Sequence, residues 1–513
     1  MQHPRPDPTP ALWAALAIIA IAALAINLAG LADYPMPHCD EAIHAELSYN
    51  AATHGRFAVD MLGSIGGFDQ NAATEGRFYH LGQGLLLRVL DESLATARLF
   101  STLGWLVATA FTFLVARRLF DPLTGALSAL VFATSLNVFW ASHIARHEIW
   151  VIASSAALLY GYLVVRAKPS RAGYAGLALL AVAGLEFHLN AVFFMLPIGL
   201  LVLADTWRTP RYLVAFAGGG LRGVSLVLLL HFLPDPAVAL DNIRLEAEAN
   251  SLSGGSFAAW MQTQWTFMET TFVSAFQGAT TLFTLYAVFG IGAAAVRRRP
   301  DTTLLLITYG AAFVLFSVAQ PHKNPLYGPL WDAGLAMLAT RALVQAAPAV
   351  ARRIRTRLPH AATAALLAAP LLGANLAGQI ELTVKFAPRD YDTYAQAILA
   401  DIPPGEPTMG DPILWFAFNG RNPFLADWIT LYGSHREAVD GGLGDVLAAY
   451  GIRYVVTDGS LGCGLQVNDV ARAFREQVEA QCQPVAEFTD RWFGAGGQNA
   501  AGHPTTIYFC PEE

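Results

Sequence analysis

Long apolar segments recur along the chain and constrain its fold more than any other feature. Each runs for roughly 17–25 residues, the length that crosses a bilayer as a helix. Only 14% of the 513 residues are charged and 54% are hydrophobic, whereas about 25% of an ordinary soluble protein is charged. The sequence therefore predicts a polytopic α-helical membrane protein. About eleven transmembrane helices are expected, at about 11–32, 96–116, 123–141, 149–165, 173–189, 191–206, 211–233, 272–296, 302–319, 326–346 and 360–380.

The first apolar segment, 11–32, has the character of a retained helix. Ten residues precede it, with one Arg and no Lys. A cleaved signal peptide has a shorter apolar region and a small-residue cleavage site. This segment is longer and runs into an acidic stretch, so we expect it to remain as the first span.

Basic residues in the short loops predict how the chain crosses the membrane. Loops rich in Lys and Arg stay in the cytoplasm, and five basic clusters alternate onto one side of the expected spans. We therefore expect a multi-pass protein of the cell membrane with a cytoplasmic N-terminus and an extracytoplasmic C-terminus. The clusters are Arg117-Arg118, Arg166 to Arg171, Arg208 with Arg211, Arg297 to Arg299 and Arg352 to Arg357.

Two extracytoplasmic segments are too long to be simple connections. The outer loop 33–95 has helical spacing after Asp40 and again over 79–90, which indicates amphipathic helices at the membrane interface. The tail has strand-like residues at 454–457 and a helical pattern around 470–478, which together predict a small soluble α/β domain. We therefore divide the chain into a transmembrane domain, 1–380, and an extracytoplasmic domain, 381–513.

All four cysteines fall outside the cytoplasm in this topology. They are Cys39 in the outer loop and Cys463, Cys482 and Cys510 in the tail. An oxidising compartment permits disulfides there, although free buried cysteines fit the pattern too. We expect at least one bridge among the three tail cysteines, with the pairing left open.

Acids and imidazoles gather directly after the first span. His38, Asp40, Glu41, His44 and Glu46 fall within nine residues at the expected membrane surface. Asp is a preferred helix N-cap. Asp40 therefore fits two interpretations, a capping residue among solvated neighbours or a carboxylate with a chemical role.

A second polar cluster lies between the third and fourth spans, where the chain reads Ser142-His143-Ile144-Ala145-Arg146-His147-Glu148. His143 and His147 are four residues apart and would share one face of a helix. Glu148 begins an apolar span, where an ionisable side chain is costly and usually functional. An acid at that position also stabilises a helix N-terminus, so both interpretations stay open.

Two further polar groups lie at the outer ends of later spans. Glu186, His188 and Asn190 form one group, and Lys323 and Tyr327 belong to the other. Lys323 is either an ordinary loop lysine or a point charge that binds a phosphate. All four polar clusters are expected at the same membrane face, beside apolar helices. This combination suits a substrate with a charged head and an apolar tail.

Other classes of function fit less well. The chain has no basic stripe with interleaved aromatics, so nothing indicates a nucleic-acid partner. A solute or lipid transporter with intramembrane polar residues is the main alternative. Such transporters often contain inverted repeats and bind at mid-membrane, and this sequence has no detectable repeat. A tail that binds a partner on an inactive membrane anchor is a third interpretation.

Several short motifs follow one another in a recognisable order. They are Asp40-Glu41, Phe78-Tyr79-His80-Leu81, Arg98-Leu99, Ala116-Arg117-Arg118-Leu119-Phe120, Ala145-Arg146-His147-Glu148 and Tyr327-Gly328-Pro329-Leu330. Over roughly residues 11–345 this order resembles the glycosyltransferase C superfamily, in the branch of protein O-mannosyltransferases and aminoarabinose transferases. The tail lies outside the resemblance, which therefore says little about the acceptor.

The resemblance implies a membrane glycosyltransferase. Its donor would be a polyprenyl-phosphate-linked sugar, and its acceptor a hydroxyl of a glycan, lipid or protein outside the cytoplasm. In an inverting displacement Asp40 would act as the base, with Glu41 and Glu148 as further catalytic acids. Substrate-binding roles would fall on His44, Arg146, His147, His188, Asn190, Lys323 and Tyr327.

Members of this superfamily differ in metal use, so the sequence leaves open whether the protein holds a divalent metal or none. Asp40, His44, His147 and Glu148 together offer the oxygen and nitrogen ligands that Mg, Mn or Zn take in proteins.

Overall fold

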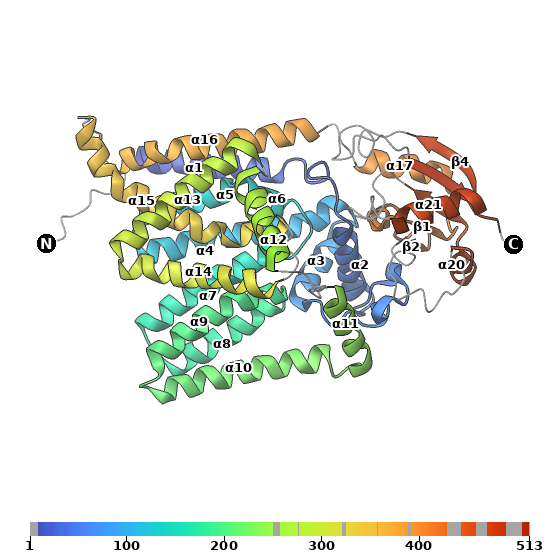
Figure 1. The fold of residues 1–513 in the computed structure, drawn as a ribbon, viewed down its shortest axis with the longest axis horizontal. Coiled ribbons are helices and arrows are strands. Elements are labelled where there is room, and N and C mark those ends of the chain that lie inside the picture. The colour runs from blue at the N-terminus through green and yellow to red at the C-terminus, as the bar shows by residue number, and fades with distance from the viewer. Residues whose placement is uncertain are drawn as a thin grey trace.

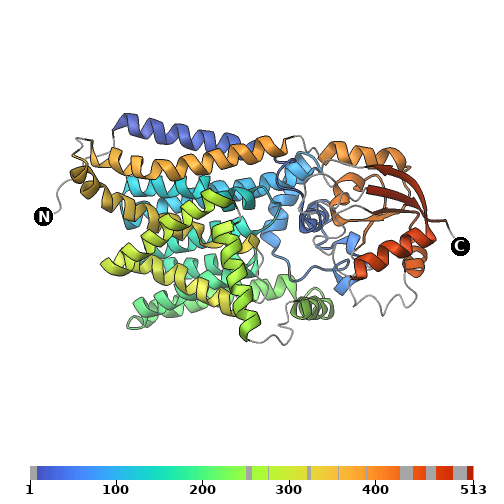
Figure 2. The same ribbon diagram turned by 45° about the horizontal axis from the view of Figure 1, so that its top comes forward.

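Helices packed side by side along one axis form a bundle, and a small α/β unit lies at one end of it (Figure 1). The computed structural model describes residues 9–249, 257–274, 276–320, 325–355, 358–387, 391–427, 443–457, 469–488 and 505–511. Figure 2 shows the same arrangement turned by 45°, with the bundle helices still aligned along the longest axis.

Each of the eleven expected spans coincides with one apolar helix or, once, with a bent pair. In the described residues nine helices are long and apolar enough to cross a membrane. The polytopic helical fold is thus confirmed. The bundle consists of α1 (Pro10–Leu28), α4 (Leu94–Leu119), α5 (Pro122–Thr134), α6 (Leu136–Ser142), α7 (Glu148–Ala167), α8 (Arg171–Leu185), α9 (Val192–Thr206), α10 (Pro210–His231), α13 (Gln277–Arg297), α14 (Pro300–Ala319), α15 (Asp332–Arg353) and α16 (His360–Phe386).

The bent pair is a departure from the expected straight span 123–141. Between α5 and α6 the chain turns by 63°. Ser135 occupies the break with an extended ψ of 133°, and its hydroxyl donates to Asp332 Oδ2 at 2.7 Å. Serine side chains can form hydrogen bonds in helical and in non-helical conformations. The apolar composition of the segment therefore did not reveal the break.

Small residues let α10 pack closely on α8. A Cβ added at Gly219 would lie 2.4 Å from the Ala175 carbonyl oxygen, and one at Gly223 would lie 2.9 Å from Val182. Glycines four apart allow this approach in membrane helices. Apart from these glycines and His231 no residue of α10 is buried, so its many apolar side chains face outward. An outward apolar surface of this kind is what lipid contact requires.

Two helices of the outer loop lie between the bundle and the α/β unit: α2 (Cys39–Thr53) and α3 (Arg77–Val89) (Figure 1). α3 buries His80, Gln83 and Leu87 but exposes an apolar row that includes Phe78 and Leu81. Such a face suits the membrane interface. Two short 3₁₀ turns, Asp60–Leu62 and Ile65–Gly67, connect α2 to α3.

Asp40 does not cap α2, contrary to the capping interpretation. His38 is the N-cap: its ring Nδ1 accepts from the Asp40 backbone N–H at 3.3 Å, and Glu41 Oε2 accepts from the His38 backbone N–H at 2.7 Å. This reciprocal pair satisfies two amides at the helix start. The Asp40 carboxylate is consequently not needed for capping.

The contact between α2 and α3 leaves no room for a side chain at Gly84. A Cβ there would lie 2.1 Å from the Ser48 carbonyl oxygen. We expect Gly84→Ala to lower the thermal unfolding midpoint of the detergent-solubilised protein, because either the helices must separate or the backbone must shift. Gly176→Ala is the matched control, since nothing lies within 4 Å of its Cβ position. That change in α8 should be neutral or stabilise by up to ~1 kcal/mol; equal effects at both positions would contradict the packing argument.

The α/β unit is built on a five-stranded sheet of order β2-β1-β3-β5-β4. β1 runs parallel to β2 and β3, whereas β5 is antiparallel to β3 and β4. The strands are β1 (Thr408–Gly410), β2 (Phe424–Ala426), β3 (Tyr454–Thr457), β4 (Gln483–Phe488) and β5 (Thr505–Phe509), with helices α17 (Tyr391–Asp401), α18 (Trp415–Phe418), α20 (Leu443–Tyr450) and α21 (Asp469–Gln481). The expected strand at 454–457 and helix near 470–478 are confirmed. The preceding helix α16 continues to Phe386, past the expected boundary at 380.

A disulfide joins the last helix of this unit to its last strand. Cys482 and Cys510 are bonded, which confirms the expected bridge among the tail cysteines. Cys39 is disulfide-bonded as well. Cys463 lies outside the described residues.

The α/β unit packs directly on the outer-loop helices. The Trp415 ring meets Tyr49 of α2 edge-on, with centroids 6.0 Å apart. Met61 and Leu62 of the outer loop share one apolar core with Met409 of β1 and Val455 of β3. α2 is therefore held between the α/β unit on one side and the bundle on the other.

Candidate functional site

Four connections meet at the end of the bundle that faces the α/β unit. They are the start of α2, the turn before α3, the loop between α6 and α7, and the loop between α8 and α9 (Figure 1). Together they carry nearly all the polar residues singled out from the sequence. Their side chains form one continuous set of contacts.

Asp40, Arg146 and Glu148 form the first part of this set. The Arg146 guanidinium contacts Asp40 Oδ2 through Nη1 and donates to Glu148 Oε1 from Nη2 at 2.8 Å and from Nε at 3.0 Å. Glu148 is 4% exposed, but Asp40 is 29% exposed. One guanidinium therefore orients two carboxylates, and Asp40 is the more open of the two.

Glu41 is held entirely inside the protein. Arg98 of α4 donates to both of its carboxylate oxygens, from Nε and Nη2, at 2.8 Å each. The Ala145 backbone N–H donates to Oε1 at 2.6 Å, and Oε2 also accepts the capping bond from His38. Glu41 thereby ties the start of α2 to α4 and to the loop before α7. This places Asp40 and Arg146 next to each other.

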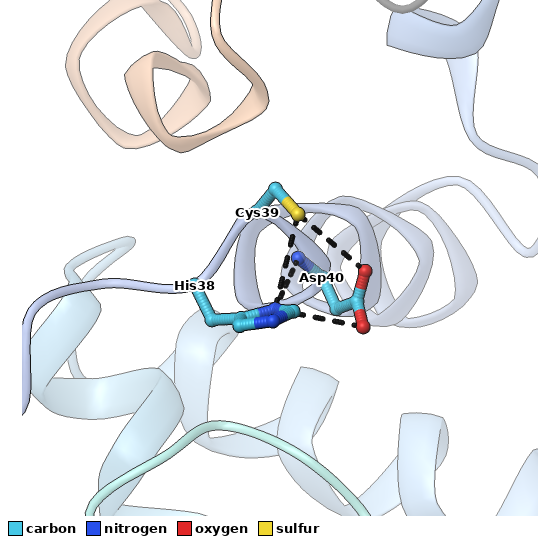
Figure 3. Close-up of side chains that lie close together, drawn as sticks. All are labelled: His38, Cys39 and Asp40. Atoms are coloured by element: carbon cyan, nitrogen blue, oxygen red, sulfur yellow. Dashed lines mark hydrogen bonds and ion pairs between the residues drawn. The ribbon is translucent and has the colours of Figure 1, made fainter. Parts of the chain in front are cut away.

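His38 and Cys39 lie beside the Asp40 carboxylate (Figure 3). His38 Nδ1 is 3.5 Å from Asp40 Oδ2, and Cys39 Sγ is 3.6 Å from Oδ1. The three side chains are close enough for one metal ion. However, Cys39 is disulfide-bonded, and a thiolate is the form of cysteine that binds metals. These three residues are therefore a poor metal site.

Imidazoles form the second part of the set. The His147 and His188 rings are stacked with centroids 3.8 Å apart, and His44 meets His147 edge-on at 4.9 Å. His147 Nε2 is 3.9 Å from Glu148 Oε1. His44 also lies near Glu75. The Glu75 Oε2 atom is 3.9 Å from His44 Nδ1 and 3.5 Å from His80 Nε2.

Burial disfavours the protonated form of three of these imidazoles, those of His80, His147 and His188. Burial lowers the pKa of His188 to about 4, and it also lowers the pKa of His147, to which the neighbouring His188 and His44 add. Burial likewise lowers the pKa of His80, although Glu75 beside it favours protonation. Neutral imidazoles do not attract anions as point charges, but they can act as metal ligands or hydrogen-bond partners.

His143 and His147 do not share a helical face, in contrast to the expectation from their spacing. The loop between Ser142 and Glu148 is not helical. His143 turns back onto Phe139, where its Nδ1 lies 2.9 Å from the carbonyl oxygen. Only His147 therefore joins the site.

Glu186 and Asn190 support the site from the loop between α8 and α9. The Glu186 carbonyl accepts from the Phe78 backbone N–H at 3.0 Å, and its carboxylate contacts His231 at 3.1 Å. The Asn190 backbone N–H donates to His188 Nδ1 at 3.1 Å, while the Asn190 side-chain amide is buried without a hydrogen bond. This loop positions both the turn before α3 and the His188 ring.

Tyr327 lies in the 3₁₀ segment η5 (Pro325–Trp331), which packs against α7. Its ring meets Phe316 edge-on at 5.6 Å. Lys323, expected to bind a phosphate, lies outside the described residues.

No family model matches the chain, and no curated protein matches it. Solved structures do. ArnT from Cupriavidus metallidurans matches in the apo state with a TM-score of 0.60 and 16% identity, over 98% of both chains. The same protein bound to undecaprenyl phosphate matches with a TM-score of 0.60 and 15% identity, again over 98% of both chains.

A more distant similarity extends to the oligosaccharyltransferase of Archaeoglobus fulgidus tethered with an acceptor peptide. Its TM-score is 0.53 at 12% identity, over 94% of this chain and 73% of that chain. The chain has the glycosyltransferase C fold. The resemblance seen in the short motifs is thereby confirmed at the level of fold.

Within this glycosyltransferase C fold, sequence reasoning missed three residues of the site. Arg98 was noted only as part of a motif, Glu75 lies in a turn without a local pattern, and His80 is separated from His44 by a whole connection. The one available signal was compositional. Each is a charged or polar residue that interrupts an otherwise apolar helix or adjoins one, which is where ionisable groups usually serve a function.

Proposed function

We propose that the protein is a membrane glycosyltransferase that moves a sugar from a polyprenyl-phosphate donor to an acceptor hydroxyl outside the cytoplasm. One observation carries the proposal: in a glycosyltransferase C fold, the partly exposed carboxylate of Asp40 is held by Arg146 at the end of the bundle. A carboxylate there lies where the head of a membrane lipid would meet a water-soluble acceptor.

Asp40 accepts the proton of the acceptor hydroxyl as its oxygen attacks the anomeric carbon. The bond between that carbon and the phosphate oxygen breaks, and its electron pair leaves with the lipid phosphate. The sugar is transferred in one displacement with inversion. Arg146 supports this step because it keeps Asp40 oriented and adds positive charge near the leaving phosphate.

The other site residues take supporting roles in this proposal. Glu148 orients Arg146, and Glu41 is a positioning residue because all its oxygens are engaged inside the protein. The lining residues His44, His147, His188, Asn190 and Tyr327 bind substrate, and we retain Lys323 as the expected contact of the donor phosphate.

The structural relatives support the choice of substrates. ArnT was solved bound to undecaprenyl phosphate, a polyprenyl phosphate, and the archaeal oligosaccharyltransferase with an acceptor peptide. We extend the lipid class to the donor of this protein. Its acceptor is a glycan, lipid or protein hydroxyl. A transporter remains the alternative, but no observation favours it, since the polar groups gather at one end of the bundle.

The proposed membrane orientation makes a separate prediction. We propose the cell membrane as the protein's location, and the five basic clusters favour a C-terminus outside the cytoplasm. A reporter that fluoresces only in the cytoplasm should therefore stay dark when fused after Glu513, and bright when fused within the loop that follows Arg297. A bright C-terminal fusion would contradict the proposed orientation.

The proposed activity is tested with the purified protein in lipid and a panel of radiolabelled polyprenyl-phosphate sugars, with membrane extract as the source of acceptors. One donor of the panel should lose its label from the lipid fraction. Two results together would favour the transporter: every sugar label stays in the lipid fraction, and the protein moves a lipid or solute across vesicle membranes.

A further inference from the structure

Three ligand-type side chains converge beside the catalytic group. One atom each of His44, Glu75 and His80 lies within 4.8 Å of the others. Glu75 Oε2 is 3.9 Å from His44 Nδ1 and 3.5 Å from His80 Nε2. Both ring nitrogens are buried and make no hydrogen bond. Polar atoms in such positions are normally paired, so these two require an explanation.

A buried hydrogen-bond chain determines which nitrogen of His80 carries the hydrogen. Gln83 Nε2 donates to the Ala97 carbonyl oxygen at 3.1 Å, so Gln83 Oε1 is the acceptor for the Ser48 hydroxyl at 2.7 Å. Ser48 thus donates its single hydroxyl hydrogen to Gln83.

The Ser48 oxygen can then only accept from His80 Nδ1, which lies 2.9 Å away. Because Nδ1 carries the hydrogen, a neutral His80 ring presents an unshared electron pair at Nε2. That pair points at a carboxylate oxygen 3.5 Å away. Two electron-rich atoms in this position repel each other unless a cation, either a proton or a metal ion, lies between them.

The formal charge of the site also calls for a cation. Four carboxylates lie here, on Asp40, Glu41, Glu75 and Glu148, against the two guanidinium groups of Arg98 and Arg146. Arg98 binds Glu41, and Arg146 binds Asp40 and Glu148. Among the described residues no Arg or Lys pairs with Glu75, whose only partners are imidazoles.

We propose that His44, Glu75 and His80 bind one divalent transition-metal ion, and that zinc is the ion that fits best. Two imidazoles and one carboxylate are a ligand set typical of zinc with an open fourth position. Magnesium and calcium prefer oxygen ligands. A hydrogen bond from the non-ligating nitrogen, as Ser48 accepts from His80, is the usual second contact of a metal-binding histidine.

This ligand set differs from the one expected from the sequence. Asp40 and Glu148 are both bound by Arg146, and His147 does not belong to the group of ligand atoms that His44, Glu75 and His80 form. Of the expected set, only His44 is retained. A tetrahedral zinc ion with bonds of about 2.0–2.1 Å sets its ligand atoms roughly 3.3 Å apart. The carboxylate lies 3.5 and 3.9 Å from the two ring nitrogens, which themselves lie within 4.8 Å of each other, so side-chain movements would have to close the site around the ion.

Metal content tests this proposal independently of sugar transfer. The full-length protein would be purified without a histidine tag, exposed to zinc, dialysed and analysed by mass spectrometry for metals. We expect about one zinc per chain, and a visible absorption band of a low-symmetry site when cobalt(II) replaces it. Glu75→Gln and His80→Ala should each lose the ion, whereas His54→Ala, which changes an exposed histidine just after the end of α2, should keep it.

A further variant tests the tautomer argument. Ser48→Ala leaves all three ligands but removes the acceptor of His80 Nδ1, so zinc affinity should fall by about 10–100-fold. Folding of each variant is checked by its thermal midpoint. A protein that retains no zinc or cobalt, or a Glu75→Gln variant that binds as tightly as the wild type, would overturn the proposal whether or not the protein transfers sugar.

Discussion

Asp40→Asn should reduce sugar transfer by about 10²–10⁴-fold, the contribution typical of a positioned general base. Asparagine has the same shape and can still accept from Arg146, but it cannot take a proton from the acceptor hydroxyl. Because His38 caps α2, the change removes no capping bond. The loss should therefore appear in kcat, with the lipid donor bound as before.

Two controls separate a lost base from a damaged fold. Asp241→Asn changes an exposed acid of α11 (Pro236–Ala249) that pairs with the nearby Arg244, and it should leave transfer unchanged. The thermal midpoint of Asp40→Asn should match that of the wild type. A variant that still transfers at nearly the wild-type rate would exclude Asp40 as the base.

Arg98→Met should destabilise the protein by about 3–5 kcal/mol, the usual cost of leaving one member of a buried ion pair unpaired. Glu41 and Arg98 are both 0% exposed, and Arg98 also donates to the Leu31 carbonyl oxygen at 2.8 Å. Methionine keeps much of the volume but leaves the Glu41 carboxylate with only two backbone donors. The measurement is the free energy of unfolding in detergent.

The double variant Glu41→Leu with Arg98→Met tests whether the unpaired charge of Glu41 causes the loss of stability. It removes the unpaired charge but also the acceptor of the His38 and Ala145 backbone N–H groups, so it should recover part of the lost stability. Transfer should stay low, because Glu41 positions Asp40 and Arg146. Arg244→Met, which breaks an exposed pair, should change stability by no more than about 0.5 kcal/mol. If the double variant is no more stable than Arg98→Met alone, the unpaired charge of Glu41 is not the reason for the lost stability of Arg98→Met.

Much of the fold could be predicted from the sequence because its signals are local. Hydropathy located the spans, and the strand Tyr454–Thr457 was visible as a β-branched and aromatic run before Asp458-Gly459. The break at Ser135 was not visible, since it depends on Asp332, which lies almost two hundred residues further along the chain.

The site could be predicted only in part, because its contacts join distant segments. Asp40, Arg146 and Glu148 were identified as charged residues flanking apolar spans, and the structure brings them together. Glu41 was expected to act with Asp40, but its pairing with Arg98 spans 57 positions and turns it inward. His80 was visible only as part of a short motif and Glu75 had no local pattern, because their relation to His44 arises from the packing of α3 and the turn before it on α2.

The central claim is that this chain transfers a sugar from a polyprenyl phosphate to a hydroxyl. The most direct measurement follows both products of one doubly labelled donor, with one label in the sugar and one in the lipid. We expect free polyprenyl phosphate and glycosylated acceptor to form in equal amounts with the wild type, and neither to form with Asp40→Asn. Intact donor after incubation across the whole panel, or release of free sugar without any glycosylated acceptor, would contradict this account.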